Sequence, residues 1–586
     1  MNIREYDILR TLKEIPCINQ RDLAESSGYS LGAVNKSLKI LIKENYINSE
    51  YLLLEKAVDE FVKNAPQRAI ILAAGFGMRM VPINTEVSKG MLEINGEPLI
   101  ERIIRQLHEV GIKEIYIVVG FMKEQYEYLI DDFGVQLIVN EEYAKKNNLY
   151  SLKLAIEYME NAYIIPCDLW CKENPFRRHE LYSWYMVSEK NDYESTVRVN
   201  RKMELVSSKH SPDGNHMIGI CYLNSKDASI IKKNVLELSA ESKNDSCFWE
   251  TALCDEKKII VAARLVPENM IVEINTYEQL REIDGNSNQL KSEVIHLLCD
   301  IFKVQTDEIY NITVLKKGMT NRSFLFWCKN KKYIMRIPGE GTDRLIDRYQ
   351  EAEVYDKIKN QGICDDIVYI DSVNGYKVTE FFEDARVCNP NNKDDVKKCM
   401  SKLKAFHDLK LKVDHQFNIF DQIQFYERLW NGKPSIYKDY EITKKNIFQL
   451  KFYIEKHRVE EVLTHIDANP DNFLFTVVDG KEEIRLIDWE YAGMQDPHVD
   501  IAMFGIYSMY ERKQMDQLID FYFENHCNRS TRIKIYCYIA ICGLLWSNWC
   551  EYKRNLGIEF GEYSLRQYRY AKEYYRIVEE ELTNNA

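Results

Sequence analysis

Hydrophobic residues follow three different spacings along this chain. The first stretch places them at helical intervals, with a turn at Gly28 between two short helices. The second alternates short apolar runs with turns and amphipathic segments, and the third passes from a strand-rich start to a long, helical and tyrosine-rich end. A polar segment, EIDGNSNQ, separates the last two. We therefore predict three domains, at residues 1–64, 68–285 and 290–586.

The second stretch has the pattern of a mostly parallel sheet. Four of its apolar runs read AIILAAG, EIYIVVG, VQLIV and AYIIPCD, and each precedes a turn or a helical segment. Strands that alternate with helices are typical of α/β proteins. Because ligands of such sheets bind beyond the carboxyl ends of the strands, we expect chemistry where these runs end.

The composition narrows the class of protein. Of 586 residues, 45% are hydrophobic and 29% are charged, as in ordinary globular proteins. The net charge of −13 argues against broad adhesion to nucleic acid or membranes. The 15 cysteines include no C-x-x-C pair, the opening MNIREYDILR is no secretory signal, and the run IYCYIAICGLLW is too short to cross a bilayer. We therefore predict a cytoplasmic protein with free thiols and no membrane insertion.

The first stretch resembles a winged helix-turn-helix. The resemblance rests on INQRDLAESSGYSLGAVNKSLKILIKENYI, in which a helix, a glycine turn and a second helix follow one another. A DNA reader usually adds arginines that bind phosphates near its recognition helix. DNA contact through residues 1–64 and a role in docking or dimerisation therefore both stay open. The polar residues that the second helix offers to a DNA groove are Asn35, Lys36, Ser37 and Lys39.

Candidate phosphate chemistry follows the first strand of the middle domain. In the stretch LAAGFGMRM, Gly75 and Gly77 allow backbone N–H groups to approach a phosphate closely. Arg79 and Lys89 add two cations, which suit a triphosphate that gains charge as pyrophosphate leaves. Asp168 ends the run AYIIPCD at the same sheet edge, where a carboxylate can hold Mg²⁺. Each residue alone would more often be a helix cap or a surface ion pair, but the arrangement favours nucleotide chemistry.

The middle domain resembles the sugar-nucleotidyltransferase superfamily and, within it, the bacterial phosphocholine cytidylyltransferases. The resemblance rests on AIILAAGFGMRM, SKGMLEINGEPLIER, NNLYSLKLA, PCDLW, FWE and EINTYEQLREID. It implies a Rossmann-like sheet in which Arg79 and Lys89 act on the nucleotide phosphates. It further implies that Asp168 holds Mg²⁺ and that Glu250 is a candidate second ligand. The nucleotide-binding loop would be formed by Leu72, Ala73, Ala74, Gly75 and Gly77.

Two departures from the family pattern concern the substrate. Ser88 stands where the family usually has a proline before the lysine. No tryptophan lies between Ser195 and Tyr222, where relatives that hold choline place one. An aminoethyl phosphate or aminoethylphosphonate therefore stands beside phosphocholine as a candidate substrate.

The most specific motif of the chain is THIDANPDNFLFTVVDGKEEIRLIDWEYAG. Its runs FLFTVV and EIRLI flank Asp479-Gly480, a turn pair typical of β-hairpins. A hairpin returns the chain to its start, so we predict that Asp488 lies near Asn472 and Asp467. This arrangement offers one carboxylate for an attacking hydroxyl and an Asn/Asp pair for Mg²⁺, as phosphoryl transfer requires.

Residues 310–575 resemble the choline/ethanolamine kinases and the related aminoglycoside phosphotransferases, which implies a protein-kinase-like fold. The stretches LKKGMTNRSFLF, YIMRIPG, RYQEAEVY and DPHVDIAMF add to the hairpin motif. The resemblance implies that Asp467 is the base and that Asn472 and Asp488 bind the metal. It implies structural roles for His465 and Asp500. The implied nucleotide-binding residues are Thr320 and Asn321 of a phosphate-covering hairpin, and Arg336 with its ion-pair partner Glu351.

The run LLWSNW places Trp546 and Trp549 on one face of an apolar helix. Core packing is the ordinary explanation for such a pair. A quaternary ammonium, however, cannot donate hydrogen bonds and is best held by aromatic faces, and the kinase resemblance puts both indoles at the choline pocket. The remaining residues predicted to bind substrate are Trp489, Glu490, Tyr563 and Tyr570.

Together these features predict a bifunctional enzyme with Mg²⁺ as cofactor. The C-terminal domain would phosphorylate choline with ATP. The middle domain would transfer CMP from CTP to phosphocholine and give CDP-choline. One alternative keeps this chemistry for ethanolamine or aminoethylphosphonate, and another treats the chain as a DNA-binding regulator that responds to choline metabolites.

Overall fold

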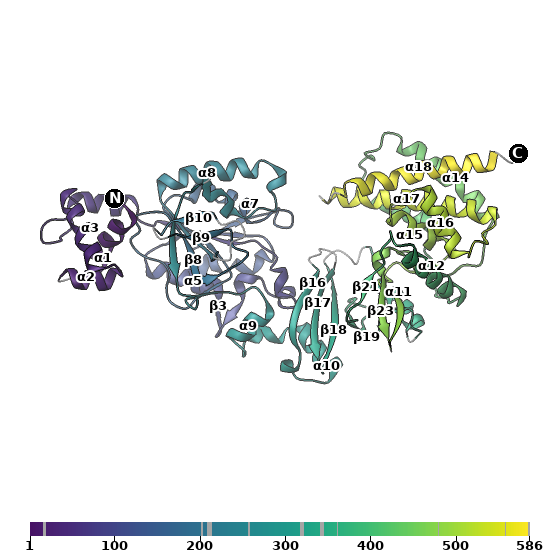
Figure 1. Cartoon of the computed structure of the whole chain (residues 1–586), viewed down its shortest axis with the longest axis horizontal. Helices are drawn as coiled ribbons and strands as arrows, with labels where there is room; N and C mark the ends of the chain where they lie inside the picture. The colour runs from purple at the N-terminus through teal and green to yellow at the C-terminus, as the bar shows by residue number, and fades with distance from the viewer. Residues whose placement is uncertain are drawn as a thin grey trace. The chain divides into compact units, whose positions relative to one another are not determined.

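The computed structural model of the chain forms two compact units, Met1–Asp307 and Glu308–Ala586 (Figure 1). Helix α10 (Glu293–Phe302) lies in the first unit, and the finer division into three domains stays a prediction. The structure describes residues 1–15, 19–200, 203–207, 214–255, 258–316, 321–339, 345–359, 361–478, 480–556, 558 and 560–583.

The chain begins with a helix-turn-helix, a short wing and a fourth helix. Gly28 ends the second helix with a φ of 74°, a left-handed conformation that glycine adopts without strain. A β-bridge between Ile47 and Leu53 forms the wing. The helices are α1 (Ile3–Glu14), α2 (Gln20–Ser27), α3 (Leu31–Lys43) and α4 (Glu55–Lys63).

Two of the four polar residues of helix α3 that could face a DNA groove are buried or hydrogen-bonded within the protein. Ser37 is buried, and the Asn35 amide donates a hydrogen bond to Gln20 Oε1 at 3.0 Å. Lys36 and Lys39 are exposed. Lysines suit contacts with DNA phosphates, which carry no sequence information directly.

The first unit is built on a seven-stranded, mostly parallel sheet with the order β14-β8-β11-β6-β1-β4-β5. Strand β1 runs parallel to β4 and β6, and β11 runs antiparallel to β6 and β8. The four apolar runs that predict strands form β1, β4, β5 and β6, so the predicted parallel α/β sheet is confirmed. The strands are β1 (Arg68–Ala73), β4 (Glu114–Val119), β5 (Gln136–Val139), β6 (Ala162–Pro166), β8 (Trp184–Asn191), β11 (Asn215–Leu223) and β14 (Ala262–Val266).

Helices cover both faces of this sheet. Ile71 of β1 packs into the core that includes α5, whereas Ile70 packs into the core that includes α7 and α8. Strands buried on both faces read as continuous apolar runs, which explains the sequence pattern.

The helices are α5 (Leu99–Glu109), α6 (Leu129–Phe133), α7 (Asn148–Leu154), α8 (Ser225–Ser239) and α9 (Tyr277–Ile283). Short ribbons are formed by β2 (Glu93–Ile94) with β3 (Glu97–Pro98), β7 (Leu169–Cys171) with β15 (Ile271–Glu273), β9 (Val197–Val199) with β10 (Leu205–Ser207), and β12 (Cys254–Asp255) with β13 (Lys258–Ile259).

The second unit joins a five-stranded antiparallel sheet, in the order β16-β17-β18-β20-β19, to a mostly helical part (Figure 1). The strands of this sheet are β16 (Tyr310–Lys316), β17 (Asn321–Cys328), β18 (Lys331–Pro338), β19 (Ile367–Ile370) and β20 (Lys377–Glu380). The other strands are β21 (Arg386–Val387), β22 (Val462–Thr464), β23 (Phe473–Val478), β24 (Lys481–Leu486) and β25 (Gly493–Gln495). The helices are α11 (Arg348–Ile358), α12 (Lys393–Asp408), α13 (Ile419–Arg428), α14 (Tyr440–Lys456), α15 (His498–Tyr507), α16 (Arg512–Tyr522), α17 (Arg529–Asn555) and α18 (Glu562–Thr583).

Helix α17 is the central element of the helical part. It has 27 residues, and by length and composition it could cross a membrane, but 94% of its most apolar window is buried within the protein. Its apolar residues pack in the core with those of α15 and α18. The run IYCYIAICGLLW therefore forms a core helix, as its sequence predicts.

A buried polar network holds α1 against the sheet of the first unit. Asp7 accepts a hydrogen bond from Tyr182 Oη at 2.9 Å. Arg10 lies 3.1 Å from Asp7 and 4.0 Å from Glu180, a carboxylate with no solvent exposure. Glu180 in turn accepts from Tyr163 Oη, on β6, at 3.0 Å. The N-terminal helices and the sheet are thus joined by charges that depend on one another.

We predict that Arg10→Met lowers the free energy of unfolding of the first unit by about 3 kcal/mol, because it removes a cation from beside a buried carboxylate. Urea denaturation of the full chain, with hydrogen exchange of peptides from residues 1–300, measures the change. The matched control is Arg21→Met, since Arg21 is exposed. Equal denaturation midpoints for the two variants would show that the network does not join α1 to the sheet.

Candidate active sites

The predicted phosphate loop leaves the sheet at the carboxyl end of β1. Leu72 is buried, and its carbonyl accepts a hydrogen bond from Cys167 N at 3.2 Å. Ala74 ties the loop to the next strand through its carbonyl, which accepts from Phe121 N at 3.2 Å. Ala73 is the last residue of β1, and Gly75 and Gly77 follow in a turn, in which Gly77 has a φ of 60°. The predicted loop residues Leu72, Ala73, Ala74, Gly75 and Gly77 therefore lie together at the ligand edge of the sheet.

Four polar side chains converge beside this loop. Lys89 Nζ donates to a carboxylate oxygen of Asp168 and, at 2.7 Å, to Asn275 Oδ1. Arg79 Nη2 donates to the same Asn275 oxygen at 2.6 Å. The structure thus brings together Arg79, Lys89 and Asp168, and it adds Asn275. Sequence reasoning quotes the motif EINTYEQLREID but misses this residue. No local sequence signal marks it. Asn275 comes near Asp168 because β15, which ends two residues before Asn275, pairs with β7, which begins directly after Asp168.

The oxygens of this cluster suit a hard divalent cation. Asp168 Oδ1 is buried and has no hydrogen-bond partner among the described residues. A carboxylate and an amide oxygen are ligands that Mg²⁺ accepts, and Mg²⁺ completes its shell with water and substrate phosphates. The described residues contain no group of three or more His, Cys, Asp or Glu side chains able to hold a metal. Asp168 and Asn275 therefore fit Mg²⁺ that arrives with a nucleotide rather than a closed metal cage.

Glu250 lies apart from these hydrogen bonds. Its Oε1 accepts from Tyr185 Oη at 3.1 Å, and its Oε2 is buried without a hydrogen-bond partner among the described residues. Burial raises the pKa of this carboxyl to about 7, and Glu273 contributes in the same direction. Its role as a second metal ligand stays a prediction.

In the second unit, a hairpin forms where the sequence predicts it. Strands β23 and β24 pair antiparallel from Phe473↔Leu486 to Val478↔Lys481. At the open end, Ile487 N donates to Asn472 O at 3.0 Å, so the next residue, Asp488, lies beside Asn472. The predicted convergence of the two metal-ligand candidates is therefore present.

Asp467 stands at the centre of the hairpin mouth. One of its carboxylate oxygens accepts from Tyr507 Oη, and the other accepts from Asn472 Nδ2 at 3.0 Å. Burial, helped by the nearby Asp488 charge, raises the pKa of Asp467 to about 7. Because the Asn472 amide nitrogen is used by Asp467, its oxygen is the group that can ligate a cation. Asn472 and Asp488 thus also offer oxygens that fit Mg²⁺.

The loop that carries Asp467 is held by a buried carboxylate. Asp500 accepts from His465 N at 2.9 Å and from Ile466 N at 2.7 Å. The ring of His465 contacts the carbonyl oxygen of Ile487 at 3.0 Å, which ties this loop to the hairpin. Ile466 and Asp488 both have φ values of 68°, an unfavourable conformation that such contacts must hold in place.

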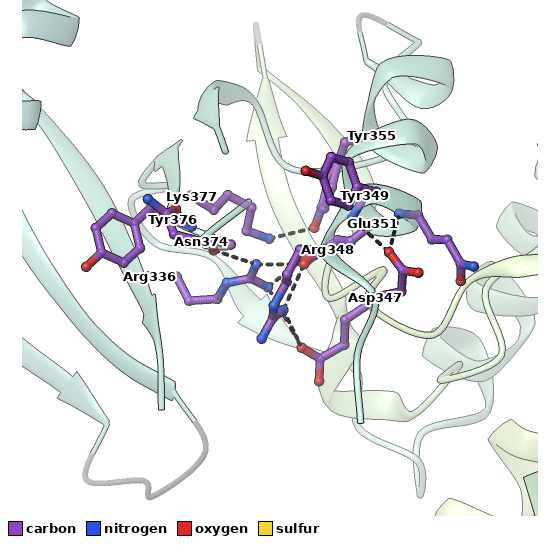
Figure 2. Close-up of polar contacts among 12 residues, drawn as sticks. Arg336, Asp347, Arg348, Tyr349, Glu351, Tyr355, Asn374, Tyr376 and Lys377 are labelled. Atoms are coloured by element: carbon purple, nitrogen blue, oxygen red, sulfur yellow. Dashed lines mark hydrogen bonds and ion pairs between the residues drawn. The ribbon is translucent and has the colours of Figure 1, made fainter. Parts of the chain in front are cut away.

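The expected ion pair of the kinase-like part is present. Arg336, on β18, contacts both carboxylate oxygens of Glu351, on α11, at 2.6 and 2.9 Å (Figure 2). Burial opposes ionisation of Glu351, but the Arg336 charge outweighs it and lowers the carboxyl pKa to about 2. Thr320, predicted to bind nucleotide, lies outside the described residues, and of Asn321 the structure describes the backbone at the start of β17.

Aromatic rings form a cluster next to Asp467. Trp546 and Trp549 meet edge to face with ring centroids 5.5 Å apart. Tyr507, which donates to Asp467, packs 5.4 Å from Trp546 and 6.4 Å from Tyr563. The cluster thus contains three of the predicted residues. Its further members, which sequence reasoning misses because they come from different segments, are Tyr491, Tyr507 and Phe560.

The structure corrects two predicted substrate contacts. Trp489 has no solvent exposure, because its Nε1 donates to Leu486 O at 2.8 Å and its ring packs into the core. Tyr570 is also fully buried and donates to Tyr510 O at 2.7 Å. Tyr570 lies two helical turns after Tyr563, where helix α18 packs against α17. Its ring fills the contact between these two helices and is not part of the aromatic cluster. Glu490, a third predicted contact, faces arginines, and its role with substrate stays a prediction.

Three family models match successive parts of the chain. They are a winged helix-turn-helix DNA-binding model over residues 1–48, a MobA-like NTP transferase domain over 69–180, and a choline/ethanolamine kinase model over 312–540. The order agrees with the predicted order of folds.

Individual proteins match the same parts over nearly their whole length. The choline-phosphate cytidylyltransferase of Streptococcus pneumoniae is 33% identical over 231 residues, which cover 38% of this chain and 100% of that protein. The 2-aminoethylphosphonate cytidylyltransferase of Lancefieldella rimae is 27% identical and covers 37% and 91%. Protein LicA of Haemophilus influenzae is 26% identical over 267 residues, covering 42% and 96%. The chain therefore belongs, through its middle part, to the choline-phosphate cytidylyltransferase family, and it joins to that part a choline/ethanolamine kinase domain and a winged helix-turn-helix domain.

Proposed function

We propose that this protein phosphorylates choline with ATP and then couples the phosphocholine to CMP from CTP. The observation that carries the proposal is the position of Tyr507. Its hydroxyl donates to Asp467 while its ring packs 5.4 Å from Trp546. An alcohol whose cationic end lies among these rings therefore has its hydroxyl beside a carboxylate. Choline combines these two groups.

The kinase step follows from the residues around Asp467. This carboxylate accepts the proton of the choline hydroxyl as the oxygen attacks the γ-phosphorus of ATP, and ADP leaves with the electrons of the broken P–O bond. Arg336 would bind the nucleotide phosphates, the role that the kinase resemblance implies for it. The aromatic faces hold the trimethylammonium group, which offers no N–H donor. Mg²⁺ at Asn472 and Asp488 would neutralise charge on the phosphates.

The transferase step uses the cluster at the end of β1. A phosphate oxygen of phosphocholine attacks the α-phosphate of CTP, and pyrophosphate leaves with the bonding electrons. Lys89 and Arg79 supply positive charge where the triphosphate gains negative charge. Asp168 and Asn275 would hold Mg²⁺ against the same phosphates. Because the product of the kinase is the substrate of the transferase, one chain can carry both reactions.

The head group accepted by the transferase has one competing candidate. A relative at 27% identity is named a 2-aminoethylphosphonate cytidylyltransferase, and residues 195–222 contain no tryptophan. The kinase aromatic cluster nevertheless favours choline over ethanolamine, since a primary ammonium gains less from a fully aromatic wall. A DNA-binding regulator is the remaining alternative, supported by the winged-helix match and weakened by an α3 that exposes only Lys36 and Lys39 of its four candidate residues.

The two active sites can be separated by substitution. We predict that Asp467→Asn lowers choline phosphorylation at least about 100-fold, because it removes the proton acceptor, and leaves CDP-choline synthesis from added phosphocholine unchanged. Lys89→Ala should have the opposite effect. Mass spectrometry of products formed from ATP, CTP and choline measures both. Loss of both activities in either folded variant would show that the assignment of two sites is wrong.

The aromatic cluster can be tested for its preference for a quaternary ammonium. We predict that Trp549→Leu raises the KM for choline about tenfold, the loss of one good cation–π contact, while the KM for ethanolamine changes less. Initial rates with the two alcohols at saturating ATP give these values.

Tyr570→Phe is the control for this experiment, because Tyr570 is aromatic and nearby in sequence but fully buried outside the cluster. It should leave both KM values unchanged. Equal effects of Trp549→Leu on choline and ethanolamine would argue that the cluster does not read the methyl groups.

A further inference from the structure

A second arginine shares the carboxylate that orients Arg336. Arg348, the first residue of α11, donates from Nη1 to Glu351 Oε2 at 2.9 Å, the oxygen that also accepts from Arg336 Nη2 (Figure 2). Arg336 and Arg348 are each about 95% buried. Two guanidinium groups on one buried carboxylate are costly to assemble unless another negative charge is nearby.

Glu490 is the second acid of the cluster: burial and the Asp488 charge raise its pKa, and the charges of Arg336 and Arg348 oppose that rise. Its Oε2 lies 3.7 Å from Arg348 and 3.9 Å from Arg336. The atom is buried and has no hydrogen-bond partner among the described residues. Glu490 follows Asp488 by two residues, so the contact links helix α11 to the loop that carries the metal-ligand candidate.

The turn before β20 is shaped around the same arginines. Gly375 has a φ of 72°, and a Cβ placed on it would lie 2.7 Å from both Cδ and Nε of Arg348. Its carbonyl accepts from Arg336 Nη2 at 3.1 Å. A side chain at position 375 would therefore displace Arg348. This close approach shows that the Arg348 side chain has a defined position, not a solvated one.

Charge balance gives Arg348 a function. With Glu490 ionised, the two positive charges of Arg336 and Arg348 face the two negative charges of Glu351 and Glu490. Without Arg348, Arg336 would be left to face both acids, next to Asp488 and beside the position where nucleotide phosphates are expected. Both acids would then also draw on Arg336, which is needed by the phosphates.

We propose that Arg348 is a positioning residue for ATP in the kinase reaction: it neutralises Glu490 and shares Glu351, so that Arg336 stays available to the nucleotide phosphates. This inference rests on the proposed kinase function. It assigns Glu490 to the arginine cluster rather than to the choline ammonium.

The charge argument makes an ordered prediction for three variants. Arg348→Met should raise the KM for ATP about tenfold or more, as expected for an unbalanced buried charge, with little change in the KM for choline. The double variant Arg348→Met/Glu490→Gln restores neutrality and should recover most of the loss. Glu490→Gln alone should leave the KM for ATP unchanged or lower it. Steady-state kinetics in ATP and in choline separate these effects.

Two further variants test position and specificity. Gly375→Ala should resemble Arg348→Met in its KM for ATP, because the new Cβ displaces the arginine. The matched control is Arg386→Met, which breaks a bidentate ion pair with Asp395 (2.6 and 2.9 Å) that is not part of the cluster, and it should leave the KM for ATP unchanged. Hydrogen exchange of peptides from residues 308–583, measured on each preparation, reports that the second unit is folded.

The proposal is overturned if Arg348→Met lowers kcat with an unchanged KM for ATP, or if Glu490→Gln deepens the defect of Arg348→Met. If Glu490→Gln raised the KM for choline and left the KM for ATP unchanged, Glu490 would belong to the substrate pocket instead. Failure of the proposed function looks different, because the unsubstituted protein would then not phosphorylate choline at all.

Discussion

The carboxyl groups of Asp467 and Asp488 lie close enough, at the mouth of the β23–β24 hairpin, for the Asp488 charge to raise the pKa of Asp467, and the fold has to hold both groups in place against this repulsion. Hydrogen bonds of the backbone hold the two carboxyl groups in place. Asp500 accepts from the two residues just before Asp467, and the hairpin positions the residue before Asp488. Hydrogen bonds from Tyr507 and Asn472 then satisfy both oxygens of Asp467. Since the groups are held in place before any ligand arrives, little reorganisation is needed when a cation and a phosphate enter.

The site of the first unit instead places opposite charges next to each other. Lys89 is shared between Asp168 and Asn275, so the cation and the carboxylate compensate each other within the site. A ligand that binds there must offer an anion to Lys89 and a cation to Asp168 at once. A magnesium-bound nucleoside triphosphate carries both, whereas a free phosphate or a free metal carries one. In the proposed reaction this ion pair would favour the complex over either component alone.

Much of this arrangement could be predicted from the sequence, because it depends on local signals. Continuous apolar runs predict strands buried on both faces, and Asp479-Gly480 predicts the hairpin that brings Asp488 to Asn472. Asn275 and Tyr507 carry no such signal, since each acts on a partner that only the folded chain brings near. Trp489 and Tyr570 show the opposite error. Spacing identifies a helical or turn position that an aromatic ring can occupy, but the neighbour that covers the ring decides whether a ligand can reach it.

Tyr507 belongs to both halves of the kinase site, and the remaining parts are separate. In the proposed kinase site, the rings contributed by α17 and α18 would bind the amine, whereas the hairpin and the arginine cluster would bind the phosphates. Exchange of a few rings could therefore redirect such an enzyme to another amino alcohol while the phosphate machinery stays intact. Tyr507 is the exception, because a change there alters the base and the wall together. Natural drift in substrate preference should thus spare this position and accumulate at the far side of the aromatic cluster.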